Sequence, residues 1–293
     1  MNKNYTNDEI KYITISDAYY PELLRLIKDP PEKLYYRGDI SLCRNLCLAV
    51  VGARKATPYG KWAAYNIAKR AAEHGIVIVS GMAAGIDSCG HRGALEAGGK
   101  TIAVLGCGID ICYPSQNKEL MERIAAKGLI LSEYPPGSPP LTFQFPLRNR
   151  IISGLSQGVV IAEASLNSGS LITADCALNQ GREVYAVPGN INSIYSIGSN
   201  KLIQDGAVPI VVIDDILEAM GITDRKEWKS DKISIRKDEK AILDLIAESG
   251  EVSIDYLCRK IEKPPSLVSA MVTVLEMKGR VQTSLGKIYI AKI

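Results

Sequence analysis

Four short segments of this chain carry the residue types that bind anions. The first covers residues 50–60, where Gly52, Arg54 and Lys55 follow a short apolar run. A glycine at a strand end lets the backbone approach a ligand closely, and free N–H groups at the start of the next helix favour an anion. Arg54 adds a planar guanidinium that suits a phosphate. Because an ordinary strand-to-helix turn has the same glycine, this segment alone predicts an anion site of unspecified purpose.

The second segment, residues 80–87, contains Ser80, Gly81 and Gly85. Asp87 is well placed to cap the following helix, and His91 lies one turn further on. A histidine near an aspartate suggests acid–base catalysis, but the sequence offers no nucleophile to complete such a site. We therefore favour capping and packing over catalysis here.

The third segment holds both phenylalanines of the chain beside three polar residues, namely Phe143, Phe145, Arg148, Asn149 and Arg150. Aromatic rings stack on unpaired bases while arginines hold phosphates, which is how single strands are bound without strong sequence choice. The alternative is that Phe143 and Phe145 belong to the core.

The fourth segment places Ser168, Gly169 and Ser170 before an apolar helical stretch. Ser170 is a candidate helix cap, and the loop is a candidate second phosphate nest. A plain capped helix start explains these residues equally well.

Several classes of site are not expected. No G-x-G-x-x-G opens the first helix and no G-x-x-x-x-G-K-[ST] occurs, so neither a dinucleotide fingerprint nor a P-loop is predicted. The seven cysteines include no C-x-x-C pair, and two histidines are too few for a convincing zinc site. We expect no metal and no cofactor.

The distribution of charge says more than the net value of +3. Residues 40–72 contain no acidic residue but several basic ones, and residues 134–162 contain only Arg148 and Arg150 as charges. Such stretches suit an anionic partner, although solvated basic faces would look the same. No apolar run reaches the roughly 18–20 residues that span a bilayer, and the amino-terminal residues are polar. We expect a cytoplasmic protein with no membrane partner.

The order of elements predicts the scaffold. Short apolar runs alternate with helical stretches at residues 46–51, 76–79, 101–105, 129–131, 159–162, 184–187 and 210–213. Near-continuous apolarity is typical of strands buried on both faces, and strand–crossover–strand order implies a parallel sheet. Residues 41–222 are therefore predicted to form an α/β domain with an extended Rossmann-like, doubly wound, mostly parallel sheet.

The flanks differ from this pattern. Residues 1–40 form a lead-in with a helix near 20–27 and a strand at 34–36, and residues 223–237 are polar, as in a linker. Residues 238–293 show three helices and a hairpin, the order of a winged helix, with a core stripe in the third helix. That stripe comprises Leu267, Met271, Val274 and Leu275. Residues 266–278 offer no Arg, Asn or Gln to contact base edges, so a small protein-contact module is favoured over a duplex reader.

Together these segments resemble the DNA-processing protein A (DprA/Smf) family. The resemblance spans residues 20–213 in family order, and it rests on residues 52–54, 80–87, 106–108, 132–137, 145–152, 168–174 and 187–190. The carboxy-terminal winged helix also resembles one found in many members. The resemblance implies an extended Rossmann fold that binds single-stranded DNA, forms a homodimer, protects incoming DNA and helps load RecA recombinase in natural transformation.

The family's DNA pocket then corresponds to Arg54 and the segment with Arg148 and Arg150. Two departures stand out. Ala84 occupies a position where the family often has arginine, and 40 residues leave room for only a remnant of the helical SAM-like domain that many members carry.

Three functions remain as alternatives. The first is a non-enzymatic, single-stranded DNA-binding recombination mediator whose site comprises Gly52, Arg54, Lys55, Ser80, Gly81, Gly85, Phe145, Arg148, Asn149, Arg150, Ser168, Gly169 and Ser170. The second is a nucleotide-metabolising Rossmann enzyme, such as a nucleoside-monophosphate phosphoribohydrolase, in which Glu163 would hold a ribose phosphate. The third is a protein-binding regulator that acts through the winged helix.

Overall fold

The structure is a computed structural model, and it describes residues 9–222, 237–277, 280–284 and 287–290. Internal contacts divide the chain into two compact units, Met1–Thr223 and Asp224–Ile293. Apart from Lys237, the linker predicted at residues 223–237 lies outside the described residues. In the described ranges, no helix is both long enough and apolar enough to cross a membrane.

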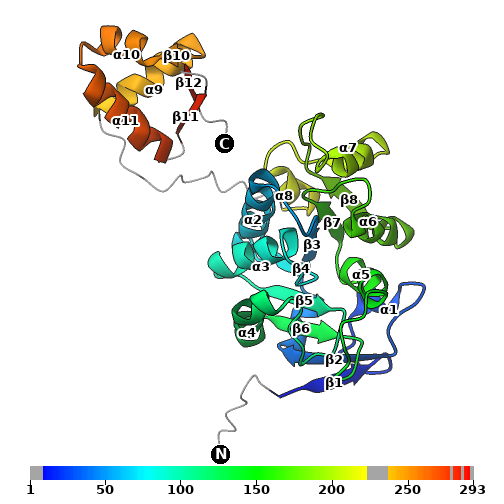
Figure 1. Ribbon diagram of the computed structural model, residues 1–293. Coiled ribbons are helices and arrows are strands. Elements are labelled where there is room, and N and C mark those ends of the chain that lie inside the picture. Colours follow the sequence, from blue (N-terminus) through cyan, green and yellow to red (C-terminus); the bar gives the residue numbers. More distant parts are fainter. Residues whose placement is uncertain (1–8, 223–236, 278–279, 285–286, 291–293) are drawn as a thin grey trace, which may run out of the picture. The chain divides into compact units, whose positions relative to one another are not determined.

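A nine-stranded sheet forms the centre of the larger unit (Figure 1). The spatial order of the strands is β1-β2-β6-β5-β4-β3-β7-β8-β9. Strand β2 is antiparallel to both of its neighbours, β1 and β6, and the other pairs described in this sheet are parallel. The strands are β1 (Lys11–Thr14), β2 (Lys33–Gly38), β3 (Cys47–Val51), β4 (Val77–Ser80), β5 (Thr101–Leu105), β6 (Leu129–Ser132), β7 (Gly158–Ile161), β8 (Glu183–Ala186) and β9 (Val208–Pro209). The prediction of a mostly parallel α/β fold is confirmed.

Helices cover both faces of the sheet. They are α1 (Glu22–Arg25), α2 (Pro58–Glu73), α3 (Ile86–Glu96), α4 (Lys118–Lys127), α5 (Gln144–Gly154), α6 (Gly169–Asn179), α7 (Ile197–Gln204) and α8 (Asp215–Ala219). Helices α2, α3 and α4 lie on one face, and α5 and α6 lie on the other (Figure 1). Alternate residues of β3 serve the two layers: Leu48 and Val50 join the core around α2, whereas Ala49 and Val51 join the core around α5 and α6. Burial on both faces explains the continuous apolar runs in the sequence.

Two predictions about the ends of this unit need correction. The apolar run at residues 210–213 is not a strand, because β9 ends at Pro209 and the chain then turns into α8. The turn is fixed by Asp215, whose Oδ2 accepts the N–H groups of Val211 and Val212 at 2.7 and 2.9 Å. At the amino end, β1 and β2 extend the central sheet through β6, so residue 40 does not mark a break in the fold.

The order of strands reverses beside β3, and this creates a place for a ligand. From β3 the chain proceeds outward through β4, β5 and β6, then returns to the other side of β3 with β7, β8 and β9. In open α/β sheets, ligands bind beyond the carboxyl ends of the strands at such a switch point. The carboxyl ends of β3 and β7 should therefore flank the functional site.

The smaller unit has the element order predicted for a winged helix. It contains α9 (Lys237–Ser249), β10 (Val252–Ser253), α10 (Ile254–Ile261), α11 (Pro265–Met277), β11 (Val281–Ser284) and β12 (Lys287–Ile290), with strand order β10-β12-β11. Its core side of α11 comprises Val268, Val272 and Leu275. The predicted stripe is wrong for Leu267 and Val274, which are 45% and 39% exposed. Residues 285–286, which join the two strands of the predicted hairpin, lie outside the described residues.

Candidate functional site

A cavity of about 620 Å³ opens at the switch point of the sheet. It lies among the loop after β3, helix α5 and the amino end of α6. The predicted site residues that line it are Gly52, Arg54, Lys55, Phe145, Arg148, Asn149, Ser168, Gly169 and Ser170. A volume of this size suits a small ligand or a short part of a larger one. Nine of the predicted site residues, far apart in the sequence, thus meet in one hollow, whereas Ser80, Gly81, Gly85 and Arg150 do not line it.

The loop after β3 is held in place by close backbone packing. The N–H of Ala53 donates to the Glu163 carbonyl at 2.8 Å, and a Cβ on Gly52 would lie only 2.7 Å from that same oxygen. Gly85 has φ +81°, and a Cβ there would collide with the carbonyl oxygens of Ala53 and Arg54. Gly52 and Gly85 therefore fix the path of the backbone that carries Arg54.

Arg54 and Lys55 project from this loop and are exposed to solvent. The guanidinium carbon of Arg54 lies 5.1 Å from the centroid of the Phe145 ring. Tyr113 flanks the same ring, with centroids 5.3 Å apart and planes inclined by 33°. A cation over an aromatic face gains about 0.5–1 kcal/mol at an exposed site, and it leaves the N–H groups free to donate. The Phe145 ring thus positions the Arg54 guanidinium and leaves its N–H groups able to donate to a ligand.

Arg148 has a different environment, although it also lines the cavity. Its side chain is buried, and Nη1 donates to the carbonyls of Gly81, at 2.6 Å, and of Val104. Burial lowers the pKa of Arg148 to about 10, still well above neutrality, so the group remains charged. The lack of a side chain at Gly81 makes room for this guanidinium, since a Cβ there would overlap it. Arg148 therefore supplies a fixed positive charge beneath the cavity.

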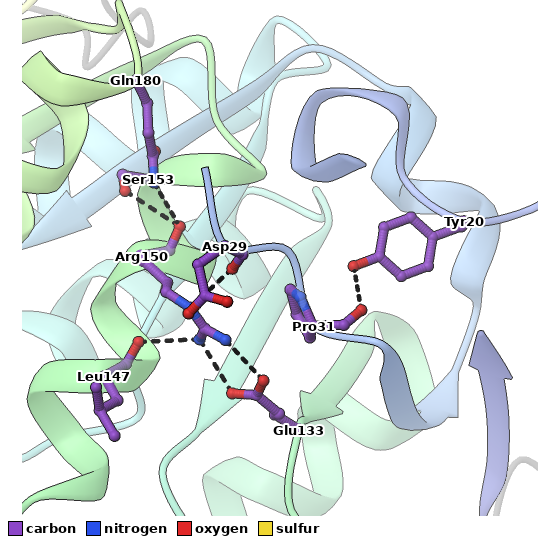
Figure 2. A network of polar contacts seen from close by, with 8 residues as sticks. All are labelled: Tyr20, Asp29, Pro31, Glu133, Leu147, Arg150, Ser153 and Gln180. Carbon is purple, nitrogen blue, oxygen red and sulfur yellow. Dashed lines mark hydrogen bonds and ion pairs between the residues drawn. The ribbon is translucent and has the colours of Figure 1, made fainter. Parts of the chain in front are cut away.

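Arg150 lies outside the cavity, contrary to the sequence-based prediction. Its Nη2 donates to Glu133 Oε1 at 2.6 Å and its Nη1 to Glu133 Oε2 at 3.0 Å, as Figure 2 shows. Its Nε donates to the carbonyl and the carboxylate of Asp29, at 3.0 and 3.2 Å. Burial lowers the pKa of Arg150, but hydrogen bonds and charges from Glu133 and Asp29 outweigh it and raise the pKa overall. Arg150 ties α5 to the end of β6 and to the loop after α1.

The amino end of α6 forms another wall of the cavity. Ser168 is the cap of this helix, and its Oγ accepts the N–H of Ser170 at 3.4 Å. Asn149 donates from Nδ2 to the Gly169 carbonyl at 3.1 Å, which joins α5 to α6. A helix start carries a partial positive charge, although the N–H groups of Ser170 and Leu171 already donate to Ser168 here. Ser168, rather than the predicted Ser170, caps this helix.

Two polar groups that suggest catalysis have structural roles. Thr101 Oγ1 donates to the Ile78 carbonyl at 2.6 Å, so at 2.7 Å it must accept the Nδ1–H of His91. Burial, with a smaller contribution from Arg148, lowers the pKa of His91 to about 3, so the ring is neutral at physiological pH. Glu163 is only 2% exposed, and its carboxylate accepts the N–H and hydroxyl of Thr57 at 2.7 and 2.5 Å. Packing of His91, favoured from the sequence, agrees with this geometry.

Ser80 is fully buried and donates from Oγ to the Val50 carbonyl at 2.6 Å. It therefore supports the ends of β3 and β4 and does not face the cavity. Phe143 is 60% exposed and is not among the lining residues, so neither a core role nor a cavity role applies to it.

Sequence reasoning missed several lining residues, chiefly Tyr113, Thr142, Ser165, Ile194 and Tyr195. Tyr113 and Tyr195 belong to long connections whose path no periodicity reveals. In the sequence, Tyr113 and Tyr195 stand out only because each follows shortly after a segment that carries the family resemblance, residues 106–108 and 187–190.

Comparisons with known proteins agree with this fold. The family model described as DNA recombination-mediator protein A matches residues 11–221, and a model described as the DprA winged helix domain matches residues 232–287. DNA processing protein DprA of Streptococcus pneumoniae is 46% identical over 204 residues, which cover 70% of this chain and 72% of that protein. The corresponding Bacillus subtilis protein is 44% identical over 217 residues, or 74% and 73% of the two chains.

Two solved structures share the architecture. The X-ray structure of DNA processing protein A from S. pneumoniae superposes with a TM-score of 0.69 at 44% identity, covering 72% of this chain and 74% of that one. DNA processing protein A from Helicobacter pylori, whose structure addresses a single-stranded DNA binding mode, gives a TM-score of 0.65 at 37% identity. That match covers 72% of this chain and 95% of the H. pylori chain.

Proposed function

The chain belongs to the family of DNA recombination-mediator protein A, and from this premise we propose that it binds single-stranded DNA in the cavity at the switch point. One observation carries the proposal: free cations, aromatic rings and a helix start line a single hollow. The charged residues that line the cavity are three cations, Arg54, Lys55 and Arg148, and one carboxylate, Asp87, which is buried. The excess of positive charge suits a phosphodiester, and the rings suit unpaired bases.

The lining residues divide the work. Arg54 and Lys55 donate to phosphate oxygens, and the partial positive charge at the start of α6 adds to the attraction. Phe145 and Tyr113 present apolar faces beside these donors. Arg148 contributes its positive charge, and its Nη1 is committed to backbone carbonyls. A backbone contact and a base contact at one point are what a non-sequence-specific single-strand site requires.

The test is titration of a labelled oligo-dT by wild type and by Arg54→Ala over a series of salt concentrations. We expect Arg54→Ala to bind about 10-fold more weakly, in line with a charge-assisted hydrogen bond of about 1.5–3 kcal/mol. Arg123→Ala is the matched control, since Arg123 is an exposed arginine of α4 on the other face of the sheet. The proposal would be contradicted if the affinity for oligo-dT changed neither with salt concentration nor on replacement of Arg54 by alanine.

We further propose that the protein protects incoming DNA and helps to load RecA recombinase in recombination and natural transformation, within the cytoplasm and without catalysing a reaction. Support for this role comes from the family to which the chain belongs. It can be measured as the rate of RecA filament formation on a single strand, which wild type should raise and Arg54→Ala should not.

A homodimer is part of the same proposal. Strand β9 lies at the edge of the sheet, and Val208, Val211 and Val212 around it are 44%, 76% and 49% exposed. Leu178 on α6 adds a further 61% exposed apolar side chain. Unpaired edges with apolar neighbours are suited to pairing with another chain. Light scattering should give a dimer for wild type and a monomer for Val211→Glu.

The geometry does not favour a nucleotide-metabolising enzyme. Glu163, the carboxylate that such a reaction would use, is buried and already accepts two hydrogen bonds from Thr57. The winged helix fits a protein-contact module better than a duplex reader, because Leu267 and Val274 are exposed on α11.

A further inference from the structure

Two aromatic side chains at the start of α2 are exposed side by side. Tyr59 and Trp62 are 48% and 54% exposed, although large aromatic side chains are usually highly buried. Their ring centroids lie 6.3 Å apart and their planes are inclined by only 20°. This ring pair, Tyr59 with Trp62, therefore offers a nearly parallel two-ring surface to solvent.

Tyr59 of the ring pair is held in a fixed position, and the Trp62 ring packs beside it. Tyr59 donates its hydroxyl to the Pro188 carbonyl at 3.0 Å, and Thr57 caps α2 immediately before it. Burial, with a smaller contribution from Glu163, raises the pKa of Tyr59, so this hydroxyl stays protonated at neutral pH. A ring that is already ordered loses little entropy when a ligand stacks on it.

Two connections link the ring pair to the cavity. Lys55, which lines the cavity, precedes Tyr59 by four residues in the loop that enters α2. On the other side, Pro188 begins the segment that contains Ile194 and Tyr195, which also line the cavity. The ring pair thus borders the same carboxyl edge of the sheet as the cavity.

The charges around the ring pair favour a polyanion. Lys61 is exposed and adjacent to Trp62, Lys55 is exposed at the start of the loop, and residues 40–72 contain no acidic residue. The carboxylate that approaches from β7, Glu163, is buried beneath Thr57. Exposed rings between lysines are the pattern by which proteins hold successive bases of a single strand.

We propose that the Tyr59–Trp62 ring pair is a second base-stacking contact for the single strand, outside the cavity, where the strand continues past Lys55. This inference rests on the proposed function. It implies that the DNA strand leaves the cavity across the start of α2. A base stacks on Trp62, while Lys61 and Lys55 neutralise the phosphates on either side.

The first test compares affinities for an oligo-dT of about 20 nucleotides, longer than the roughly 4–16 nucleotides that one single-strand fold covers. Trp62→Ala should weaken binding about 10-fold, and Trp62→Phe should keep most of the affinity because the ring face remains. Tyr12→Ala is the control, since Tyr12 is 61% exposed but lies on β1 at the edge of the sheet opposite β9. Equal affinity of Trp62→Ala and wild type would overturn the assignment.

The second test is spectroscopic and does not depend on a loss of affinity. The chain has two tryptophans, Trp62 and Trp228. In a Trp228→Phe background, oligo-dT should quench the emission of Trp62, and the quench should saturate together with the anisotropy of the labelled strand. Binding that responds to Arg54→Ala but leaves Trp62 emission unchanged would overturn the ring-pair contact and leave the cavity proposal standing. Absence of any oligonucleotide binding by wild type would overturn both.

Discussion

Replacing Arg150 by alanine should weaken the fold of the larger unit and leave its affinity for a single strand unchanged. The sequence places Arg150 among the DNA contacts, whereas the structure surrounds it with carboxylates. Its side chain is 15% exposed, that of Glu133 is 26% exposed, and the pair is joined by two hydrogen bonds of 2.6 and 3.0 Å. The variant therefore separates a structural role from a binding role.

The magnitude follows from what the substitution leaves behind. Without Arg150 the partly buried carboxylate of Glu133 loses its cation, and removal of one partner from a buried pair costs about 3–5 kcal/mol. Because Glu133 retains some contact with water, we take a value below that range, about 2–3 kcal/mol. Asp29 is 80% exposed, so its ion pair adds little. At about 2–4 °C per kcal/mol for a domain of this size, the Tm should fall by roughly 5–10 °C.

The assay is urea unfolding combined with oligo-dT titration at a temperature where the variant is folded. Asp29→Ala is the control and should change the free energy of unfolding by less than about 0.5 kcal/mol. A double-mutant cycle with Glu133→Gln should show that the two effects are coupled, because the side chains share one ion pair. An unchanged Tm with a large loss of DNA affinity would refute the reasoning, since Arg150 would then contact DNA directly.

Three further outcomes are expected. Lys55→Ala should reduce the slope of log affinity against log salt by about 0.7, the value for one phosphate of a single strand, and Arg123→Ala should not. Gly85→Ala should lower the free energy of unfolding, measured in urea, by about 3 kcal/mol or more, because φ is +81° and a Cβ would collide with two carbonyl oxygens. Gly181→Ala is the control and should cost only about 1 kcal/mol, because φ is +67° but no atom lies within 4 Å of the added Cβ. Since the pKa of His91 falls from 6.5 to about 3 on folding, the unfolded chain binds the extra proton, and stability should decline below pH 6.5 by up to about 1.4 kcal/mol per pH unit until pH 3. His91→Gln should flatten that decline in urea unfolding measured against pH.

Consecutive residues of α5 show how far the sequence could be taken. Arg148, Asn149 and Arg150 were assigned to one site because their types suit phosphate. On a helix each residue is rotated by 100° from the last, so three neighbours face three directions. Arg148 turns beneath the cavity, Asn149 reaches α6, and Arg150 turns towards β6. Residue type alone could not give this rotation, because α5 has polar and apolar residues on all its sides.

Positions next to buried strands were more predictable. Gly52 and Arg54 follow β3, and the carboxyl end of a parallel strand at a switch point has a fixed relation to the ligand. The space that a side chain would need at Gly81 and Gly85 is taken by protein atoms, so the structure gives both glycines a packing role. Their contact with a ligand stays a prediction. Tyr113 and Tyr195 were missed because a long loop reaches the cavity by a path that only tertiary packing sets.

Arg148 and Arg150 bond to groups of the protein itself, and this limits how much of the DNA affinity can come from phosphate contacts. With Arg150 paired to Glu133 and Arg148 bonded to backbone carbonyls, Arg54 and Lys55 are the lining cations whose side chains are exposed. With Lys61 beside the ring pair as a third phosphate contact, the three contacts at about 0.7 each give a salt slope of only about −2.1, which is shallow for a single-strand binding protein. Affinity must then rest largely on base stacking, at about 1–3 kcal/mol per ring contact. On this reasoning, Phe145, Tyr113 and the Tyr59–Trp62 ring pair hold the strand at salt concentrations where a purely electrostatic site would release it.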